Sequence, residues 1–396
     1  MRLVFHWFLP TSGDGRGIVG GGPSGWQAQQ ERSADDRPQN APPGRRSQTV
    51  TRPPSLDYLT QIARSAEQLG FTGVLTPTGT WCEDAWLVTA ALTRETSRLK
   101  FLVAFRPGLT SPTLAAQMAA TYQRISRGRL LLNVVTGGDA VEQQRFGDWL
   151  EHDQRYARTD EFLAIVRKLW SGAPVDFDGQ HLKIAGGLVP TPPDPLPQIY
   201  FGGSSEAALP VAARHVDVYL TWGEPPAQVA QKIARVRELA EAGGRTLRFG
   251  IRLHTISRDS SREAWAEADR LIEAIDPTTL ARAQSQLGAS QSVGQQRMVA
   301  LHGGRLDKLE IYPNLWAGIG LVRGGAGTAL VGSHQEVADR IEEYHSIGIE
   351  EFIFSGYPHL EEAYWFGEGV RPELVRRGLI DDTVSTSARR ELVPAL

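Results

Sequence analysis

Eight short apolar runs alternate with longer amphipathic segments along this chain, and that alternation limits the folds it can adopt. Strands and helices in strict alternation are typical of a parallel sheet with helical crossovers. The predicted strands span residues 3–10, 73–77, 99–105, 130–136, 198–202, 216–222, 247–256 and 351–355. The predicted helices span residues 55–69, 84–94, 113–125, 154–171, 205–213, 226–242, 261–274, 334–346 and 359 to about 377. No G-x-G-x-x-G turn follows the first strand, so the pattern favours an α/β (β/α)8 TIM barrel over a doubly wound sheet.

Three segments interrupt the repeat, after predicted strands 1, 4 and 7. Residues 17–54 are rich in Gly, Pro, Ser, Gln and Arg and almost lack aliphatic side chains, which predicts a flexible insertion. Residues 173–195 contain Asp178-Gly179 between two alternating runs, a pattern that indicates a β-hairpin. Residues 276–332 form a long active-site insertion, because loops after the strands lie on the catalytic face of such a barrel.

The last insertion ends in a glycine-rich segment, residues 314–332, with Arg323 as the single arginine among six glycines. Glycine loses much conformational freedom on ordering, so we expect neither a stable helix nor a regular strand here. A mobile loop with one permanent cation is what an anion-gated lid over an active site would look like. The alternative interpretation is a surface linker with an isolated charge.

Composition excludes several classes of protein. With 396 residues, of which 41% are hydrophobic, the chain can bury a large core, and we expect one domain over residues 1–380 and a tail at 381–396. A net charge of −3 argues against non-specific binding to nucleic acid or to an anionic membrane. One cysteine, Cys82, excludes an intrachain disulfide and a cysteine zinc site, and the dispersed histidines predict no metal site. The first apolar run is too short for a signal or membrane segment, so a cytoplasmic protein is expected.

Two motifs at predicted strand ends could bind an anion. Gly203, Ser204 and Ser205 open a helix, where backbone N–H groups and hydroxyls can hold a phosphate; an ordinary serine N-cap is the alternative. Arg252 and His254 lie two residues apart on a predicted strand and therefore point to the same face. A buried arginine without an anion is costly, which favours a pocket over a packed core, although His254 alone could be a hydrogen-bonded core histidine.

The remaining candidates have weaker signals. Tyr357 and His359 follow the last strand, and a capping turn before the final helix is the alternative interpretation. Cys82 has no neighbouring base in the sequence, and a lone cysteine is more often inert. No nucleophile pair and no G-x-S-x-G elbow is present, so the site suits a bound aromatic cofactor that performs the chemistry.

A set of short strings runs in order from residue 1 to about 370: Trp7-Phe-Leu-Pro-Thr11, Pro77-Thr-Gly79, Cys82-Glu-Asp-Ala-Trp86, Asn133-Val-Val-Thr-Gly137, Phe201-Gly-Gly-Ser-Ser205, Tyr219-Leu-Thr-Trp-Gly-Glu-Pro-Pro226, Phe249-Gly-Ile-Arg-Leu-His254, residues 314–332 and Ser355-Gly-Tyr-Pro-His-Leu-Glu-Glu-Ala-Tyr364. Together these strings closely resemble the FMNH2-dependent alkanesulfonate monooxygenases of the bacterial-luciferase-like superfamily.

The resemblance implies a two-component enzyme. A separate NAD(P)H:FMN reductase would supply FMNH2, and this chain would use it with O2 to split an alkanesulfonate into an aldehyde and sulfite. The members of the family assemble as homo-oligomers. The residues that match the family's sulfonate and flavin-reaction site are Arg252, His254, Trp222, Tyr357, Arg323 and Cys82. Those that match its FMN contacts are Asn133, Thr136, Tyr156, Ser204 and Ser205, beside the cradle residue Gly203.

Two departures from the family pattern concern substrate range. Ser12 stands where the family usually has a histidine, and the insertion at residues 17–54 is longer than usual. A sibling enzyme for methanesulfonate or another small organosulfur compound is therefore an alternative. An F420-dependent oxidoreductase of the same superfamily is a more distant alternative, and a flavin carrier without turnover is disfavoured by Arg252, His254 and Arg323.

Overall fold

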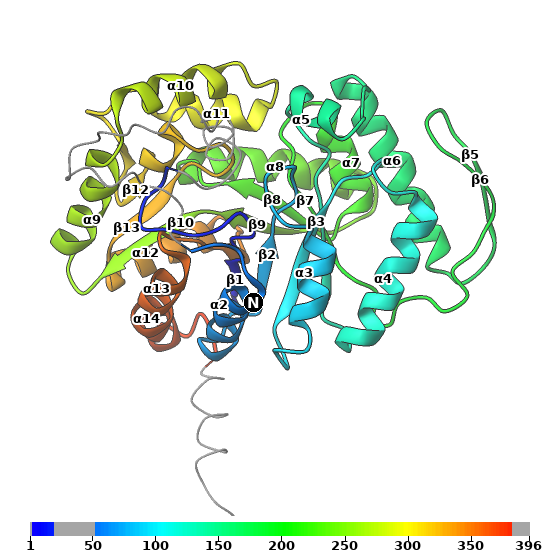
Figure 1. Ribbon diagram of the computed structural model, residues 1–396, viewed down its shortest axis with the longest axis horizontal. Helices are drawn as coiled ribbons and strands as arrows, with labels where there is room; N and C mark the ends of the chain where they lie inside the picture. The colour runs from blue at the N-terminus through cyan, green and yellow to red at the C-terminus, as the bar shows by residue number, and fades with distance from the viewer. Residues whose placement is uncertain (1, 20–51, 382–396) are drawn as a thin grey trace, which may run out of the picture.

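The structure, a computed structural model, describes residues 2–19 and 52–381. Eight parallel strands close into a barrel in the order β1-β14-β9-β8-β7-β4-β3-β2, which confirms the predicted (β/α)8 fold (Figure 1). The strands are β1 (Val4–Phe8), β2 (Gly73–Thr76), β3 (Lys100–Phe105), β4 (Leu130–Val134), β7 (Ile199–Phe201), β8 (Val218–Trp222), β9 (Arg248–Arg252) and β14 (Glu351–Ile353).

Helices connect the strands, and polar side chains cap the starts of several of them. Ser55, Asp84 and Ser111 each accept a hydrogen bond from a first-turn backbone N–H, which satisfies donors that a helix start leaves unpaired. The covering helices are α2 (Leu56–Gln68), α3 (Ala85–Leu92), α4 (Pro112–Ser126), α6 (His152–Leu169), α7 (Ala208–His215), α8 (Pro226–Ala242) and α12 (His334–Ser346). The chain then continues through α13 (His359–Tyr364), a π-helix (Trp365–Val370) and α14 (Arg371–Arg376), and the short α5 (Ala140–Arg145) follows β4.

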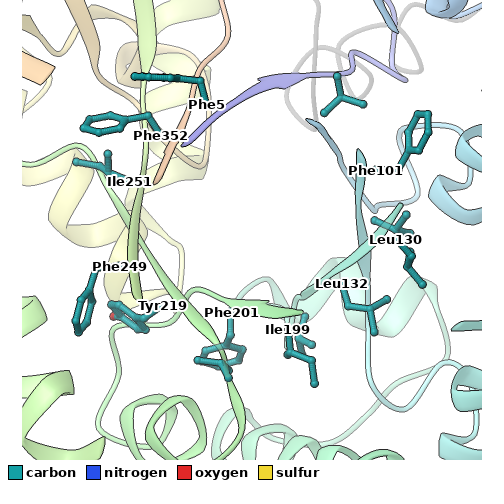
Figure 2. Close-up of a cluster of buried hydrophobic side chains, with 14 of the residues drawn as sticks. Phe5, Phe101, Leu130, Leu132, Ile199, Phe201, Tyr219, Phe249, Ile251 and Phe352 are labelled. Carbon is teal, nitrogen blue, oxygen red and sulfur yellow. The ribbon is translucent and has the colours of Figure 1, made fainter. Parts of the chain in front are cut away.

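Alternation along the strands divides the core into two layers. One set of side chains points away from the barrel axis toward the helices, as Figure 2 shows for Phe201, Phe249 and Phe352. The other set fills the barrel interior and includes Leu131 and Leu220. Each such burial is worth about 1.5–3 kcal/mol of transfer free energy, so the two layers stabilise the scaffold that carries the site.

The excursion after strand 7 differs from the prediction in where it begins. We expected one strand over residues 247–256, but β9 ends at Arg252 and β10 (His254–Arg258) belongs to a second sheet. The Leu253 N–H still donates to the barrel carbonyl of Ile353, whereas the His254 N–H donates to Thr328. The hydrogen-bond partner therefore changes within one residue, and the insertion starts at residue 254 rather than 276.

The second sheet orders this insertion on one side of the barrel (Figure 1). Its strand order is β10-β13-β12-β11, with β10 and β13 parallel. The insertion contains α9 (Ser261–Glu273), α10 (Pro277–Gly288), α11 (Val293–His302), β11 (Glu310–Tyr312), β12 (Leu315–Trp316), a 3-10 turn (Gly318–Leu321) and β13 (Ala329–Ser333).

The expectation that residues 314–332 hold no regular strand was wrong at both ends of the segment. β12 and β13 pair with each other, and β13 also pairs with β10. Tertiary pairing of the strands outweighs the conformational cost of the glycines. Most of the irregular backbone of this segment lies between Val322 and Thr328, around Arg323.

The other two insertions have different outcomes. β5 (Val175–Asp178) and β6 (Lys183–Gly187) form the expected antiparallel hairpin. Most of the segment at 17–54, which we predicted to be flexible, lies outside the described residues, and so does the tail beyond residue 381. Asp14 and Arg52, which lie on opposite sides of the undescribed residues in the sequence, form a β-bridge. In the described part of the chain no helix is long and apolar enough to cross a membrane.

Candidate functional site

A chain of polar contacts joins two neighbouring strand ends at one part of the barrel mouth. Arg252 ends β9, and its Nη1 donates to the Ser355 hydroxyl at 3.1 Å, just beyond β14. The same Ser355 oxygen lies 2.7 Å from His254 Nδ1. Because arginine can only donate, Ser355 accepts from Arg252 and has its own proton free for His254. His254 Nε2 then donates to the Ala326 carbonyl at 3.1 Å.

Tyr357 brings the arginine of the glycine-rich segment into the same cluster. Its ring stacks on His254 with centroids 5.5 Å apart, and the Arg323 guanidinium lies 5.1 Å from the tyrosine ring centroid. Arg323 Nη1 also donates to the Tyr357 hydroxyl. On the other side, Arg252 stacks over Phe8 at 4.5 Å. The structure therefore brings together four of the predicted residues: Arg252, His254, Arg323 and Tyr357.

This cluster carries excess positive charge. Burial and the neighbouring Arg323 lower the pKa of Arg252 to about 9, and burial lowers the pKa of Arg323 to about 10. Neither guanidinium forms an ion pair with a carboxylate in residues 2–19 and 52–381. Burial and both arginines hold the pKa of His254 well below its usual range, so this histidine is neutral at pH 7. Asp14 raises the pKa of Arg323 through its negative charge but forms no ion pair with it, so both guanidiniums remain suited to binding an anion.

Hydrogen bonds on both sides fix the turn that carries Arg323. Gln284 of α10 donates to the Leu321 carbonyl at 2.5 Å, and Gln295 of α11 accepts from the Gly325 N–H at 2.9 Å. Further along, the Thr328 hydroxyl donates to the Gly223 carbonyl beyond β8 at 2.7 Å. The insertion helices thus hold Arg323 over the ends of the barrel strands.

The sequence pattern gave Asp14 no role and offered His359 as a candidate with a capping turn as the alternative, and the structure places both residues in this cluster. Asp14 lies beyond β1 and accepts from His359 Nδ1 and from the His359 backbone N–H, each at 2.9 Å. The His359 ring packs between Phe8 and Tyr357, with centroid distances of 5.5 and 5.2 Å. Despite burial, the charge interaction with His359 and hydrogen bonds from His359, Tyr58 and Gly15 keep the pKa of Asp14 below its usual value. The sequence signal that could have indicated this role was the position of Asp14 shortly after the first strand.

Trp222 and Cys82 make no ring or hydrogen-bond contact with the cluster within the part of the chain that the structure describes. Trp222 ends β8 and pairs in register with Arg252, while its ring packs close to Gly294 of α11. Cys82 follows β2 and its thiol is directed at the Pro77 and Gly79 carbonyls. Burial raises the pKa of Cys82 to about 12, so the thiol is protonated at neutral pH and is not a nucleophile.

The predicted FMN contacts gather on another arc of the barrel mouth. Asn133 lies on β4, which pairs with β7, and Thr136 follows it with its hydroxyl 3.2 Å from Thr159 of α6. Tyr156, on the same helix, packs edge-on against Phe201 at 6.2 Å. Helix α6 therefore connects the ends of β4 and β7 on this side of the mouth.

The turn after β7 has the features of an anion cradle. Gly203 has no room for a Cβ, which would lie 2.7 Å from Ala208, and its carbonyl accepts from the Tyr219 hydroxyl at 2.7 Å. The Ser205 hydroxyl is close enough to Tyr156 to oppose the burial that raises that tyrosine's pKa. Yet the Ser205 Oγ is buried without a hydrogen-bond partner among the described residues. A buried donor of this kind fits a phosphate oxygen.

Comparison with protein families identifies the chain. The model of the luciferase-like monooxygenases matches residues 14–351. The chain belongs to the luciferase-like monooxygenase family. Both arcs of the mouth lie within the matched range, apart from Phe8 before it and Ser355, Tyr357 and His359 after it.

Solved structures of this family share the fold at low sequence identity. A riboflavin lyase with modified FMN is 21% identical, with a TM-score of 0.75, over 96% of this chain and 93% of that one. A long-chain alkane monooxygenase is 20% identical, with a TM-score of 0.74, over 96% and 93%. The EDTA monooxygenase of Chelativorans sp. BNC1 is 19% identical, with a TM-score of 0.72, over 97% and 96%. The fold of this luciferase-like monooxygenase is therefore shared by enzymes with very different substrates.

Proposed function

We propose that this luciferase-like monooxygenase uses FMNH2 and O2 to convert alkanesulfonates into aldehydes and sulfite. The observation that carries the proposal is the pair of guanidiniums, Arg252 and Arg323, without a carboxylate partner in the described chain. A sulfonate has one negative charge shared by three oxygens, which suits two planar donors, one at the end of β9 and one on the turn of the insertion. The neighbouring Phe8 and Tyr357 rings offer an apolar surface for the alkyl carbon next to sulfur.

The flavin arc supports FMN as the cofactor. The orphaned Ser205 hydroxyl and the cradle at Gly203 would hold the phosphate, with Ser204 beside them. Asn133, Thr136 and Tyr156 would line the approach from β4 and α6. When bound, reduced FMN supplies the two electrons that activate O2 for insertion of one oxygen atom into the substrate. We propose further that a separate NAD(P)H:FMN reductase provides this reduced flavin and that the chain assembles as a homo-oligomer.

The roles of the chain's own residues follow from their contacts. Arg252 and Arg323 would orient the sulfonate. The hydrogen bonds that Gln284 and Gln295 make with the Arg323 turn would keep this turn over the site, where it would exclude water. The oxidation balances as alkanesulfonate, O2 and FMNH2 giving aldehyde, bisulfite, FMN and water.

Sulfite release tests the proposal directly. The protein is supplied with FMNH2, O2 and a panel of linear sulfonates from one to ten carbons, and sulfite is measured together with the aldehyde. We expect equal amounts of both products and none without O2, and the chain-length profile separates an enzyme for methanesulfonate from one for longer sulfonates. Oxidation of a secondary alcohol with F420, without sulfite from any sulfonate, would contradict the proposal and favour the deazaflavin alternative.

A further inference from the structure

The cluster contains two histidines, and they differ in whether one ring nitrogen is left without a hydrogen bond. His254 uses both nitrogens: Nδ1 accepts from Ser355, and Nε2 donates to the Ala326 carbonyl. This pattern leaves His254 without a lone pair for a substrate proton. It also connects Arg252, through Ser355, to the backbone of the Arg323 turn, which is a positioning role.

His359 has the opposite arrangement. Its Nδ1 contacts the Asp14 carboxylate at 2.9 Å, and the pKa of Asp14 is lowered by its charge interaction with His359 and by its hydrogen bonds, so Asp14 is ionised and Nδ1 carries a proton toward it. In the neutral form of the ring, Nε2 is then a lone-pair acceptor. No hydrogen bond in residues 2–19 and 52–381 involves it, although the whole residue is only 2% exposed.

The contacts of the His359 ring place it beside the anion site. The ring lies between Phe8, over which Arg252 stacks, and Tyr357, to which Arg323 donates. Asp14 holds the ring from the opposite side and is itself fixed by the Tyr58 hydroxyl at 2.5 Å and the Gly15 N–H at 2.8 Å. A carboxylate behind a histidine, with the far nitrogen free, is the arrangement that orients a general base.

We propose that His359, oriented by Asp14, is the general base of this site and that His254 is not. The step rests on the proposed function. Oxygen insertion next to sulfur gives a 1-hydroxyalkanesulfonate, whose hydroxyl proton passes to His359 Nε2. The O–H electrons form the C=O bond, the C–S bond breaks, and its electron pair leaves with sulfite. Arg252 and Arg323 hold the leaving sulfonate group while its charge grows.

Tautomers can be measured without flavin or substrate. Protein with 15N-labelled histidine rings is examined by NMR at neutral pH, and the two rings are assigned with His359→Gln and His254→Gln. We expect His359 to be protonated on Nδ1 and His254 on Nε2. In Asp14→Asn, whose amide can donate to Nδ1, the proton of His359 should move to Nε2. A wild-type His359 protonated on Nε2 would overturn the proposal.

Chemical rescue then separates a base from a structural residue. His359→Ala should lower kcat for sulfite release by about 10²–10⁴-fold, the usual contribution of a general base, and added imidazole should restore part of it. His254→Ala should lose activity without rescue, because its role is to hold Ser355 and Ala326. Near-native activity in His359→Ala, or a loss that imidazole leaves unchanged, would contradict the proposal. If the wild-type protein releases no sulfite, the proposed function fails, and the tautomers still decide whether His359 presents a base.

Discussion

At the scale of single residues, the site is marked by charges that the fold does not neutralise. Arg248 and Arg252 stand at the two ends of the same strand, β9, yet only Arg248 has a carboxylate partner, Glu351. The pKa of Arg252 is lowered, so its charged form costs folding free energy at every pH where it is protonated. Such a cost is typical of a functional position rather than a structural one.

This difference predicts opposite effects for two matched substitutions. Arg252→Met should raise the free energy of unfolding of the ligand-free protein by about 1–3 kcal/mol, because it replaces an uncompensated buried charge with an apolar chain. Arg248→Met should lower it, because Glu351 then loses its cation. Urea unfolding of the two variants and the wild type checks both signs. A less stable Arg252→Met protein would mean that this arginine is structurally paired.

Cys82 gives a second test at this scale. Its raised pKa, about 12, means that the thiolate forms only at strongly alkaline pH. Iodoacetamide at pH 8 should therefore leave Cys82 unmodified in the native protein and alkylate it readily in urea, where the pKa returns to about 8.5. Mass spectrometry measures the two rates. Rapid alkylation of the native protein would show that the Cys82 thiol is reactive and would contradict this account.

At the scale of elements, the second sheet and the helices α10 and α11 convert a glycine-rich segment into an ordered turn. Gly327 lies against Gly320, and a Cβ on it would meet the Gly320 Cα at 2.7 Å. Because the contacting atoms of Gly320 belong to the backbone, they cannot move aside for a methyl group on Gly327. The close approach of these two glycines therefore sets the position of Arg323.

We accordingly expect Gly327→Ala to weaken sulfonate binding by tenfold or more while FMN binding stays within about twofold, since the cradle lies on another arc; tenfold corresponds to about 1.4 kcal/mol. Gly288→Ala is the matched control, because nothing lies within 4 Å of its added Cβ at the end of α10. That control should bind both ligands as the wild type does. Isothermal titration with sulfonate and with FMN gives the four constants, and equal sulfonate affinity in the two variants would contradict this account.

The elements also show what sequence can and cannot predict. The alternating pattern predicted the barrel. The sequence also marked Arg252, His254, Arg323 and Tyr357 as candidate site residues, but it did not indicate that their side chains contact one another. The break at Leu253 was missed because hydropathy continues through it, while only the change of hydrogen-bond partner ends the strand. The tautomer of His359 depends on Asp14, which is 345 positions away in the chain, so no local pattern could indicate it.

At the scale of the whole molecule, the two ends of the barrel differ in how their charges are compensated. Near the strand starts, buried Glu351 accepts from the Tyr200 hydroxyl at 2.8 Å and from Arg248, and lies 3.2 Å from His6 Nε2. These partners hold its pKa below the usual value despite burial. This end surrounds its buried carboxylate with several donors, whereas the mouth retains two arginines that form no ion pair with a carboxylate of the described chain.

Glu351→Gln should therefore destabilise the fold by roughly 3–5 kcal/mol at pH 7 without changing ligand affinity, because one member of a buried ionic network is lost. A lowered folded-state pKa stabilises above the unfolded value of about 4.3, and that contribution disappears as pH falls through the folded pKa. The stability gap between the variant and the wild type should thus shrink below pH 4. Urea unfolding at pH 7 and at pH 3.5 measures it, and a gap that widens in acid would contradict the assignment.

The central claim is that the unpaired arginines select a sulfonate for oxidation by reduced flavin. The most direct test supplies FMNH2 and O2 with either octane-1-sulfonate or octane, since a long-chain alkane monooxygenase shares this fold. The account predicts aldehyde and sulfite from the sulfonate, no oxidation of octane, and a strong loss in Arg323→Lys, because lysine lacks the planar fork. Oxidation of octane by the wild type, or undiminished sulfite release by Arg323→Lys, would contradict it.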